Sequence, residues 1–197
     1  MVMVTQIGEF RAMFILSAVL TLLLLALRQW RQAAFAGATL LCTALANTGS
    51  KWFFARVRPE VLSEPLTSFS MPSGHSSGSF ALFLTLAVLA GRGQPPRMRL
   101  TWLLLGCLPA AAIALSRVYL GAHWPTDILA GAMLAACVCA ASLTLSQWQG
   151  PLKPMPARAW WLLLPVMLLM CGYMATRHLP HALLRYCLLY TSPSPRD

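Results

Sequence analysis

Three short segments of the sequence carry residues whose types and spacing suit the handling of phosphate. They cover residues 51–59, 72–75 and 116–127, and each lies beside a long apolar run. Together they supply three cations, two histidines and one carboxylate: Lys51, Arg58, Arg117, His75, His123 and Asp127. A phosphoryl group in transfer spreads negative charge over three equatorial oxygens, which guanidinium and ammonium groups can neutralise. The set therefore predicts phosphoryl transfer.

The residues before His75 predict a second contribution to phosphate binding. Ser73 and Gly74 immediately precede an apolar run, so Ser73 is a candidate helix N-cap. The N-terminus of a helix is itself an anion site, and a glycine lets the backbone approach a ligand closely. We therefore expect Ser73 and Gly74 to bind phosphate together with the three cations.

The two histidines can divide the chemistry between them. His123 lies four residues before Asp127, and Pro125 suits the first position of a helix. A carboxylate at that helix start can accept one imidazole N–H, fix the tautomer and leave the other nitrogen free to attack phosphorus. His75, in a different segment, is the candidate general acid that protonates the leaving alkoxide.

This double displacement needs no metal and no other cofactor. Besides Asp127, which is assigned to His123, the motif loops contain only Glu60 and Glu64 as hard oxygen ligands. A magnesium or two-metal phosphatase needs several carboxylates that converge on the ion. We therefore expect metal-independent activity.

The three segments resemble, in order and spacing, the signature motifs of the type 2 phosphatidic acid phosphatase superfamily. The matching patterns are Lys51-x6-Arg58-Pro59, Pro72-Ser73-Gly74-His75 and Ser116-Arg117-x5-His123-x3-Asp127, and the resemblance extends over residues 5–141. It implies a helical bundle, a phosphohistidine intermediate on His123 and His75 as the acid. It also implies that the substrate phosphate is held by Lys51, Arg58, Ser73, Gly74 and Arg117.

The composition indicates a membrane protein. Hydrophobic residues make up 58% and charged residues 10% of the sequence, against about 25% charged in a typical globular protein. The 15 Lys and Arg residues exceed the 5 Asp and Glu residues and give a net charge of +10. They stand singly or in small groups between apolar runs, so they do not predict nucleic-acid binding. They fit the loop charges of a membrane protein instead.

Six uncharged runs predict the membrane-spanning helices. Their bounds are Ala12–Leu27, Ala33–Ser50, Ser76–Gly91, Leu100–Ser116, Ile128–Gln149 and Ala159–Thr176. Several are near the lower limit of roughly 17–25 residues required to cross a bilayer. The expected fold is an all-α, polytopic transmembrane bundle of about six helices.

The loop charges predict which end of the bundle faces the cytoplasm. Three alternate loops contain basic residues and no acid: Arg28 and Arg31, then Arg92, Arg97 and Arg99, then Lys153 and Arg158. The positive-inside rule places these loops in the cytoplasm. The motif segments of a multi-pass protein in the cytoplasmic (inner) membrane then face the periplasm or the cell exterior.

The order of motifs and spans predicts an N-terminally truncated phosphatase core over residues 1–150. Members of the superfamily usually carry the first motif after a third helix, whereas here it follows the second span. We therefore expect a missing first helix and an upstream membrane domain in a longer protein. Residues 151–186 are interpreted as a loop and one additional transmembrane helix, and residues 187–197 as a non-native tail.

Three functions are compatible with the sequence. The first is an integral membrane phosphatase acting on a lipid phosphate or diphosphate, such as phosphatidic acid, phosphatidylglycerophosphate or undecaprenyl diphosphate. The second is a lipid phosphotransferase with a polyprenyl diphosphate donor, and the third is a catalytically silent lipid-binding or transport module. The phosphatase is favoured over the silent module because all six charged or titratable motif positions are intact.

Four residues lie within or beside the motif segments but are not assigned to catalysis or to phosphate binding. Arg56 is expected to be an interfacial anchor whose charged head reaches water. Tyr119 and Trp124 are expected to be packing or interface residues. Ser116 is expected to end a helix, and its hydroxyl is an open candidate for phosphate contact.

Overall fold

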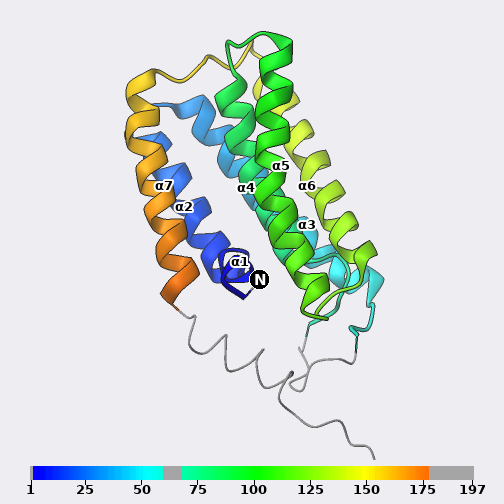
Figure 1. Cartoon of the computed structure of the whole chain (residues 1–197). Coiled ribbons are helices and arrows are strands. Elements are labelled where there is room, and N and C mark those ends of the chain that lie inside the picture. Colours follow the sequence, from blue (N-terminus) through cyan, green and yellow to red (C-terminus); the bar gives the residue numbers. More distant parts are fainter. Residues whose placement is uncertain (1, 60–67, 178–197) are drawn as a thin grey trace, which may run out of the picture.

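The computed structural model describes residues 2–59 and 68–177, and the regular secondary structure in these ranges is entirely helical. In chain order the helices are α1 (Val2–Ile7), α2 (Phe10–Ala26), α3 (Trp30–Phe54), α4 (Gly74–Gly91), α5 (Pro96–Tyr119), α6 (Pro125–Ser146) and α7 (Ala157–Arg177). The long helices α2 to α7 coincide with the expected spans to within a few residues at each end (Figure 1). The expectation of an all-α bundle is therefore confirmed.

The long helices differ in how apolar they are. By length and composition, α4, α5, α6 and α7 can each cross a membrane. α2 is apolar but has 17 residues, and α3 has 25 residues with a more polar sequence. Several polar side chains of α3 are buried against other helices: Gln32, Thr39, Thr43 and Asn47. α3 therefore places much of its polarity inside the bundle.

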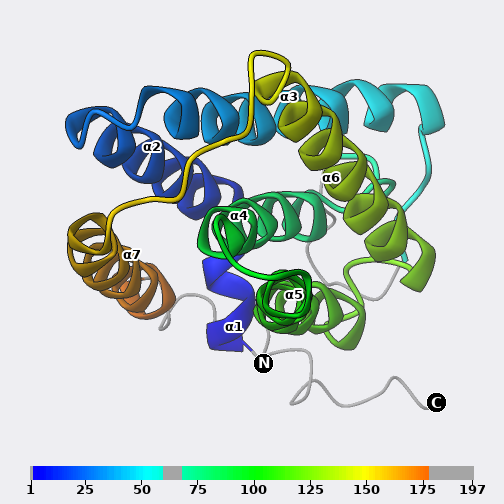
Figure 2. The same cartoon turned by 90° about the horizontal axis from the view of Figure 1, so that it is seen from above.

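α4 is the central helix. It contacts α2, α3, α5 and α6, and Figure 2 shows it in the middle of the bundle. A Cβ atom on Gly131 of α6 would lie 2.8 Å from the carbonyl oxygen of Ser73, and one on Gly106 of α5 would lie 2.8 Å from that of Phe83. Small residues at such positions let helix backbones approach closely in a membrane protein. The start of α4 is thereby held against α6.

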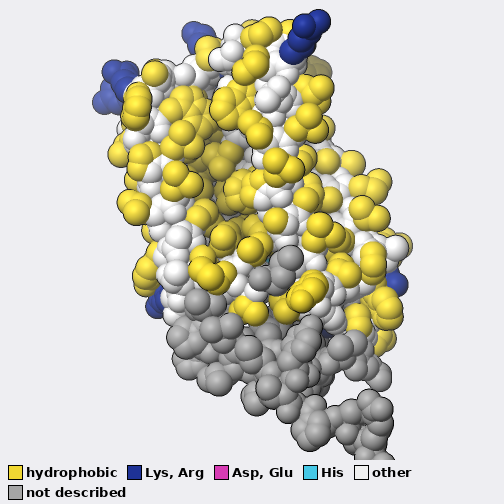
Figure 3. Space-filling model, viewed as in Figure 1, with side chains coloured by type: hydrophobic (Ala, Val, Ile, Leu, Met, Phe, Trp, Pro, Cys, Tyr) yellow, Lys and Arg dark blue, Asp and Glu magenta, His cyan; other side chains and the backbone are white. Residues whose placement is uncertain are grey.

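The two ends of the bundle differ in their loops. The connections α2–α3, α4–α5 and α6–α7 lie at one end, drawn at the top of Figure 1, where Lys and Arg side chains project (Figure 3). We call this the basic end. The connections α3–α4 and α5–α6 lie at the opposite end together with the motif segments, and we call this the motif end. The loops with basic residues and no acid therefore lie at the end opposite to the motif segments, as the alternation of loops along the chain predicted.

α1 and α7 lie to one side of the central helix. α7, the expected additional helix, packs against α1 and α2. No helix was expected over residues 2–7, but α1 forms there, at the motif end (Figure 1), and packs against α5 and α7 (Figure 2). The interpreted tail at residues 187–197 lies outside the described residues, as do Glu60 and Glu64.

Candidate active site

The three motif segments meet at the motif end, each delivered by a helix end. The ends of α3 and α5, the starts of α4 and α6, and the connections after α3 and α5 supply the side chains. In that order they are Lys51, Arg117, His75, Asp127, Arg58 and His123. The three cations and His123 all lie close enough to His75 to act on it electrostatically. The structure thus brings together all six charged or titratable residues singled out in the sequence.

The start of α4 is capped by Ser73. The Ser73 hydroxyl accepts from the backbone N–H of Ser76 at 3.4 Å, and its own N–H donates to the carbonyl oxygen of Asp127 at 3.0 Å. A Cβ atom on Gly74 would meet only Oδ1 of Asn47, at an ordinary contact distance of 3.6 Å. Packing against the described residues therefore does not require a glycine at position 74. A glycine would be required here if a ligand approached the backbone closely, as we expect for phosphate.

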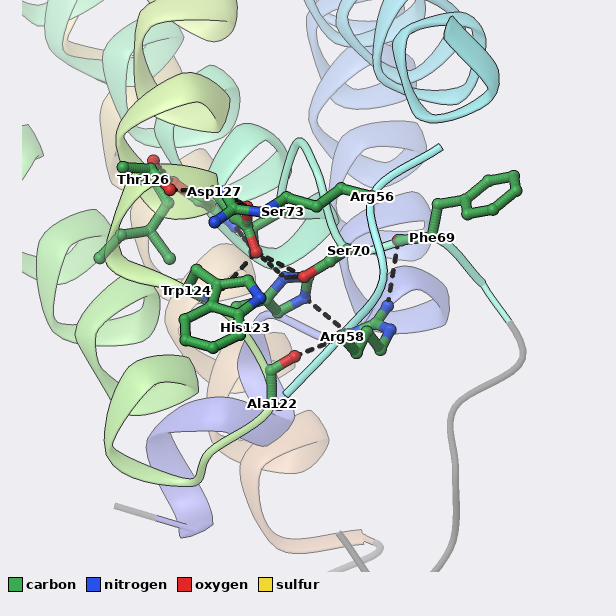
Figure 4. A network of polar contacts seen from close by, with 12 residues as sticks. Arg56, Arg58, Phe69, Ser70, Ser73, Ala122, His123, Trp124, Thr126 and Asp127 are labelled. Carbon is green, nitrogen blue, oxygen red and sulfur yellow. Dashed lines mark hydrogen bonds and ion pairs between the residues drawn. The ribbon is translucent and has the colours of Figure 1, made fainter. Parts of the chain in front are cut away.

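Arg58 and Asp127 determine which nitrogen of neutral His123 carries the proton. Nε2 lies 3.0 Å from Nη1 of Arg58, and because a guanidinium can only donate, Nε2 must accept. Nδ1 then carries the proton, 3.4 Å from Oδ2 of Asp127 and 3.4 Å from the hydroxyl oxygen of Ser70. The lone pair of His123 therefore lies on the nitrogen that faces the cation (Figure 4).

The surroundings of His123 favour its neutral form. His123 is buried, and this burial lowers its pKa below the ordinary value for histidine. The charges of Arg58, Arg117 and Lys51 lower the pKa further, while that of Asp127 opposes them. A neutral imidazole whose lone pair is on Nε2 is the form that can attack phosphorus.

Backbone carbonyl groups orient Arg58 and Lys51. Nε of Arg58 donates to the carbonyl oxygen of Ser68 at 2.7 Å, and Nη1 donates to that of Ala122 at 2.9 Å. Nζ of Lys51 donates to the carbonyl oxygen of Phe69 at 2.6 Å. These bonds to backbone carbonyl groups fix the direction of both side chains at the motif end.

α1 covers the part of the site that contains Arg117 and His75. Arg117 is 4% exposed, and its Nη1 donates to the hydroxyl of Thr5 at 2.9 Å. A Cβ atom on Gly8, in the turn after α1, would lie 3.0 Å from Cδ2 of His75. The N-terminal segment therefore forms one wall of the site, which the motifs alone did not predict.

Asp127 is fully buried and bonded through both carboxylate oxygens (Figure 4). Oδ1 accepts from Nη1 of Arg56 at 2.9 Å, while Oδ2 accepts from the hydroxyl of Ser70 and, at 2.9 Å, from the backbone N–H of Trp124. The contact with Trp124 belongs to a capping box at the start of α6, where Pro125 is the first residue. The side chain of Arg56 is partly exposed, as an interfacial anchor would be, but its guanidinium also pairs with this buried carboxylate, which the sequence interpretation did not anticipate.

Ser116 is bonded within its own helix. α5 continues to Tyr119, so the expectation that Ser116 ends the helix is wrong. Its buried hydroxyl donates to the carbonyl oxygen of Ile113 at 2.6 Å. The hydroxyl hydrogen of Ser116 is used in this bond, so it is not available to donate a hydrogen bond to a phosphate oxygen in this structure.

The sequence matches the model of one protein family. The family model of the PAP2 superfamily matches residues 32–151, which include all three motif segments and more than half of the chain. The chain belongs to the PAP2 superfamily. The resemblance noted from the motifs is therefore confirmed.

Two curated relatives have names that describe phosphatases. The PAP2 chain is 37% identical over 105 residues to an undecaprenyl-diphosphatase of Sulfolobus acidocaldarius, a match covering 51% of this chain and 45% of the relative. It is 34% identical over 93 residues to phosphatidylglycerophosphatase B of Bacillus subtilis, covering 44% of each. The matches thus span less than half the length of either relative.

A solved structure has the same fold. The crystal structure of a transmembrane PAP2-type phosphatidylglycerolphosphate phosphatase from Bacillus subtilis superimposes with a TM-score of 0.63. The match covers 73% of this chain and 73% of that one, at 23% sequence identity. Together with the apolar helices, this likeness supports a multi-pass membrane protein.

Arg56 and Ser70 are the site residues that the sequence interpretation missed. A signal existed for Arg56, because it lies two residues before Arg58 in a non-helical stretch, and alternate residues of an extended chain share a face. For Ser70, which is fully buried, the sequence offers only its position two residues before Pro72.

The donor set of the described residues contains no cluster suited to a metal ion. Over residues 2–59 and 68–177 of this PAP2 chain, no group of three or more His, Cys, Asp or Glu side chains is placed to hold one. Asp127 is occupied by Arg56, Ser70 and Trp124. The expectation of metal-independent activity stays a prediction.

Proposed function

We propose that this PAP2 chain is the catalytic core of an integral membrane phosphatase that hydrolyses a lipid phosphate or polyprenyl diphosphate. The observation that carries the proposal is the placement of His123 between Arg58 and Asp127, which leaves the lone pair of Nε2 beside a cation. The names of the relatives, an undecaprenyl-diphosphatase and a phosphatidylglycerophosphatase, support this substrate class.

The substrate phosphate binds among three cations and one helix start. Lys51, Arg58 and Arg117 hold its equatorial oxygens, while Ser73 and Gly74 offer the N-terminus of α4. At an effective dielectric constant near 20, each close charge contact contributes about 4 kcal/mol before desolvation is subtracted. The lipid chain extends from this end along the apolar surface of the bundle.

The first chemical step transfers the phosphoryl group to His123. Nε2 attacks phosphorus as the bond to the leaving oxygen breaks, and His75, which is protonated when the anionic substrate is bound, gives its proton to the leaving alkoxide. The carboxylate of Asp127, whose Oδ2 lies 3.4 Å from Nδ1, stabilises the positive charge that develops on the ring. The products of this step are the lipid alcohol and a phosphohistidine.

The second step hydrolyses the phosphohistidine. His75, now neutral, takes a proton from water while the water oxygen attacks phosphorus and the N–P bond breaks. Inorganic phosphate leaves, His123 regains its lone pair, and His75 is again protonated. A lipid hydroxyl in place of water would give the phosphotransferase reaction, and a silent module would carry out neither step.

The motif end faces the periplasm or the cell exterior in this proposal. It rests on the positive-inside rule applied to the loops of the basic end. Labelling a single cysteine introduced into a cysteine-free background tests it, with Val57→Cys at the motif end and Gln94→Cys at the basic end. Val57→Cys should react with an impermeant reagent in intact cells, and Gln94→Cys only after permeabilisation. The reverse pattern would place the site in the cytoplasm.

The activity is tested by phosphate release from purified protein in detergent. Dioleoyl phosphatidic acid, phosphatidylglycerophosphate and undecaprenyl diphosphate are compared with and without a second lipid that carries a free hydroxyl. Release of phosphate that is lost in His123→Ala supports hydrolysis at this site. Phosphorylated acceptor lipid in place of free phosphate indicates phosphotransfer, and neither product indicates the silent module.

A further inference from the structure

The carboxylate of Asp127 is held by Arg56 on one side and faces His123 on the other. Arg56 Nη1 donates to Oδ1 at 2.9 Å, and Oδ2 is the oxygen nearest Nδ1 of His123, at 3.4 Å. The side chain of Asp127 is 0% exposed and that of Arg56 is 37% exposed. Arg56 is therefore a partly exposed side chain that is paired with a fully buried carboxylate.

Three further contacts fix Arg56 in this position. Nη1 also donates to the hydroxyl of Thr126 at 2.6 Å, and the guanidinium lies 5.5 Å from the centre of the Trp124 ring. The carbonyl oxygen of Arg56 accepts from the backbone N–H of Ser70 at 2.8 Å, while the hydroxyl of Ser70 donates to Oδ2 of Asp127. Side chain and backbone of Arg56 thus act on both oxygens of one carboxylate.

We propose that Arg56 is a positioning residue for the phosphatase reaction, which holds the carboxylate of Asp127 so that Oδ2 stays directed at Nδ1 of His123. The inference rests on the proposed function, because it assigns Arg56 a part in that reaction. The terminal torsion of an aspartate side chain is broad. The bond to Arg56 engages Oδ1, while Oδ2, which also accepts from Ser70 and Trp124, lies on the side of the imidazole.

Arg56 and Arg58 lie two residues apart but act on opposite sides of His123. Arg58 Nη1 lies 3.0 Å from Nε2, on the side where the phosphate is expected, whereas Arg56 touches Asp127, on the Nδ1 side. Loss of Arg58 should therefore weaken binding of anions. Loss of Arg56 should leave anion binding intact and slow the chemical step.

The test compares Arg56→Gln and Arg56→Lys with wild type, and uses Arg11→Gln as a control that removes an exposed charge from the start of α2 at the same end. In metal sites, removal of the carboxylates and other groups that orient a ligating histidine typically costs about 10- to 100-fold in metal affinity or activity, and we take this as the scale for a group that orients Asp127. We expect Arg56→Gln to lower kcat by about 10- to 100-fold, with KM and the vanadate inhibition constant changed less than about threefold. Arg56→Lys should recover part of kcat, and Arg11→Gln should match wild type.

A double-mutant cycle separates positioning from a structural effect. If Arg56 acts through Asp127, Arg56→Gln should cost little further activity in an Asp127→Asn background. The same fold loss in both backgrounds would overturn the inference, as would a wild-type kcat in Arg56→Gln or a parallel loss of vanadate binding. A wild-type protein that releases no phosphate from any of the three lipids would refute the proposed function and this inference with it. An active wild type with an unimpaired Arg56→Gln variant would refute the inference alone.

Discussion

Cations at the two ends of the bundle both bind backbone carbonyl groups, but their arrangement differs. At the basic end, Arg31 donates to the carbonyl oxygens of Ser146 at 2.8 Å and Gly150 at 2.6 Å, beside the C-terminal end of α6. The last carbonyl groups of a helix lack partners within it and carry partial negative charge. Arg31 therefore satisfies groups that the fold itself leaves unpaired.

At the motif end the cations converge on a single point. Burial lowers the pKa of His123, the charges of Arg58, Arg117 and Lys51 lower it further, and among the described residues Asp127 acts in the opposite direction. Cations at the basic end complete the fold, whereas we propose that those at the motif end bind the phosphate of the substrate.

The largest expected effect is the loss of turnover in His123→Ala. No other described residue presents a lone pair between Arg58 and Asp127, so the covalent step has no substitute. We expect phosphate release to fall by at least about 10,000-fold, and a phosphoenzyme trapped by acid quench to disappear. His75→Ala should instead slow formation of the phosphoenzyme, less so for substrates with good leaving groups. Wild-type phosphate release in His123→Ala would show that the mechanism is wrong.

A matched pair of arginines tests the difference between the ends directly. Arg58→Gln should lower kcat/KM by about 100- to 1,000-fold, as loss of a group that stabilises transition-state charge does elsewhere. Arg31→Gln should leave kcat/KM within about twofold and lower the free energy of unfolding by about 1–3 kcal/mol, because it loses charge-assisted hydrogen bonds. Steady-state kinetics and thermal unfolding in one detergent measure both. Similar kinetic losses in the two variants would contradict the comparison.

The sequence predicted the long helices because charge is confined to short stretches between uncharged runs. It predicted the start of α6 because Pro125 suits the first position of a helix, whereas the capping box that Asp127 closes there was seen only in the structure. The proximity of His75 to the other motif residues was predicted from the family resemblance, because the spacing of residues along the chain does not show which helix ends meet.

The missed features depend on tertiary structure. The pairing of Arg56 with Asp127 joins residues 71 positions apart in the chain, and no periodicity encodes it. α1 has six residues, too few for a helical pattern to be recognised. The uncharged run that predicted α3 contains Thr39, Thr43 and Asn47, and only the packing shows that these side chains are buried.

Vanadate should stabilise the protein through the motif end. It can adopt the trigonal-bipyramidal shape of the phosphoryl group in transfer, with His123 axial and the three cations at its equatorial oxygens. At 100 times its dissociation constant it should add about 2.7 kcal/mol, which raises the unfolding temperature by roughly 5–10 °C.

Arg31→Gln should keep this vanadate shift and Arg58→Gln should lose most of it. EDTA should alter neither the shift nor the activity, because the described residues place no cluster of metal ligands at the site. Activity that vanished with EDTA and returned with magnesium would contradict the proposed chemistry.

The smallest expected effect is a pH dependence of stability that comes from His123. Its pKa is lowered in the folded protein, so the unfolded chain binds a proton near pH 6.5 while the folded one does not. The stabilisation is therefore fully present above about pH 6.5 and is lost as pH falls below it. Between pH 7 and pH 5 the loss amounts to at most about 2 kcal/mol, since each pH unit is worth about 1.4 kcal/mol per proton. In phosphate-free buffer, wild type should lose more unfolding free energy over this interval than His123→Gln does, by up to that amount. Equal losses would mean that burial and the neighbouring cations at the motif end do not keep His123 neutral in the folded protein.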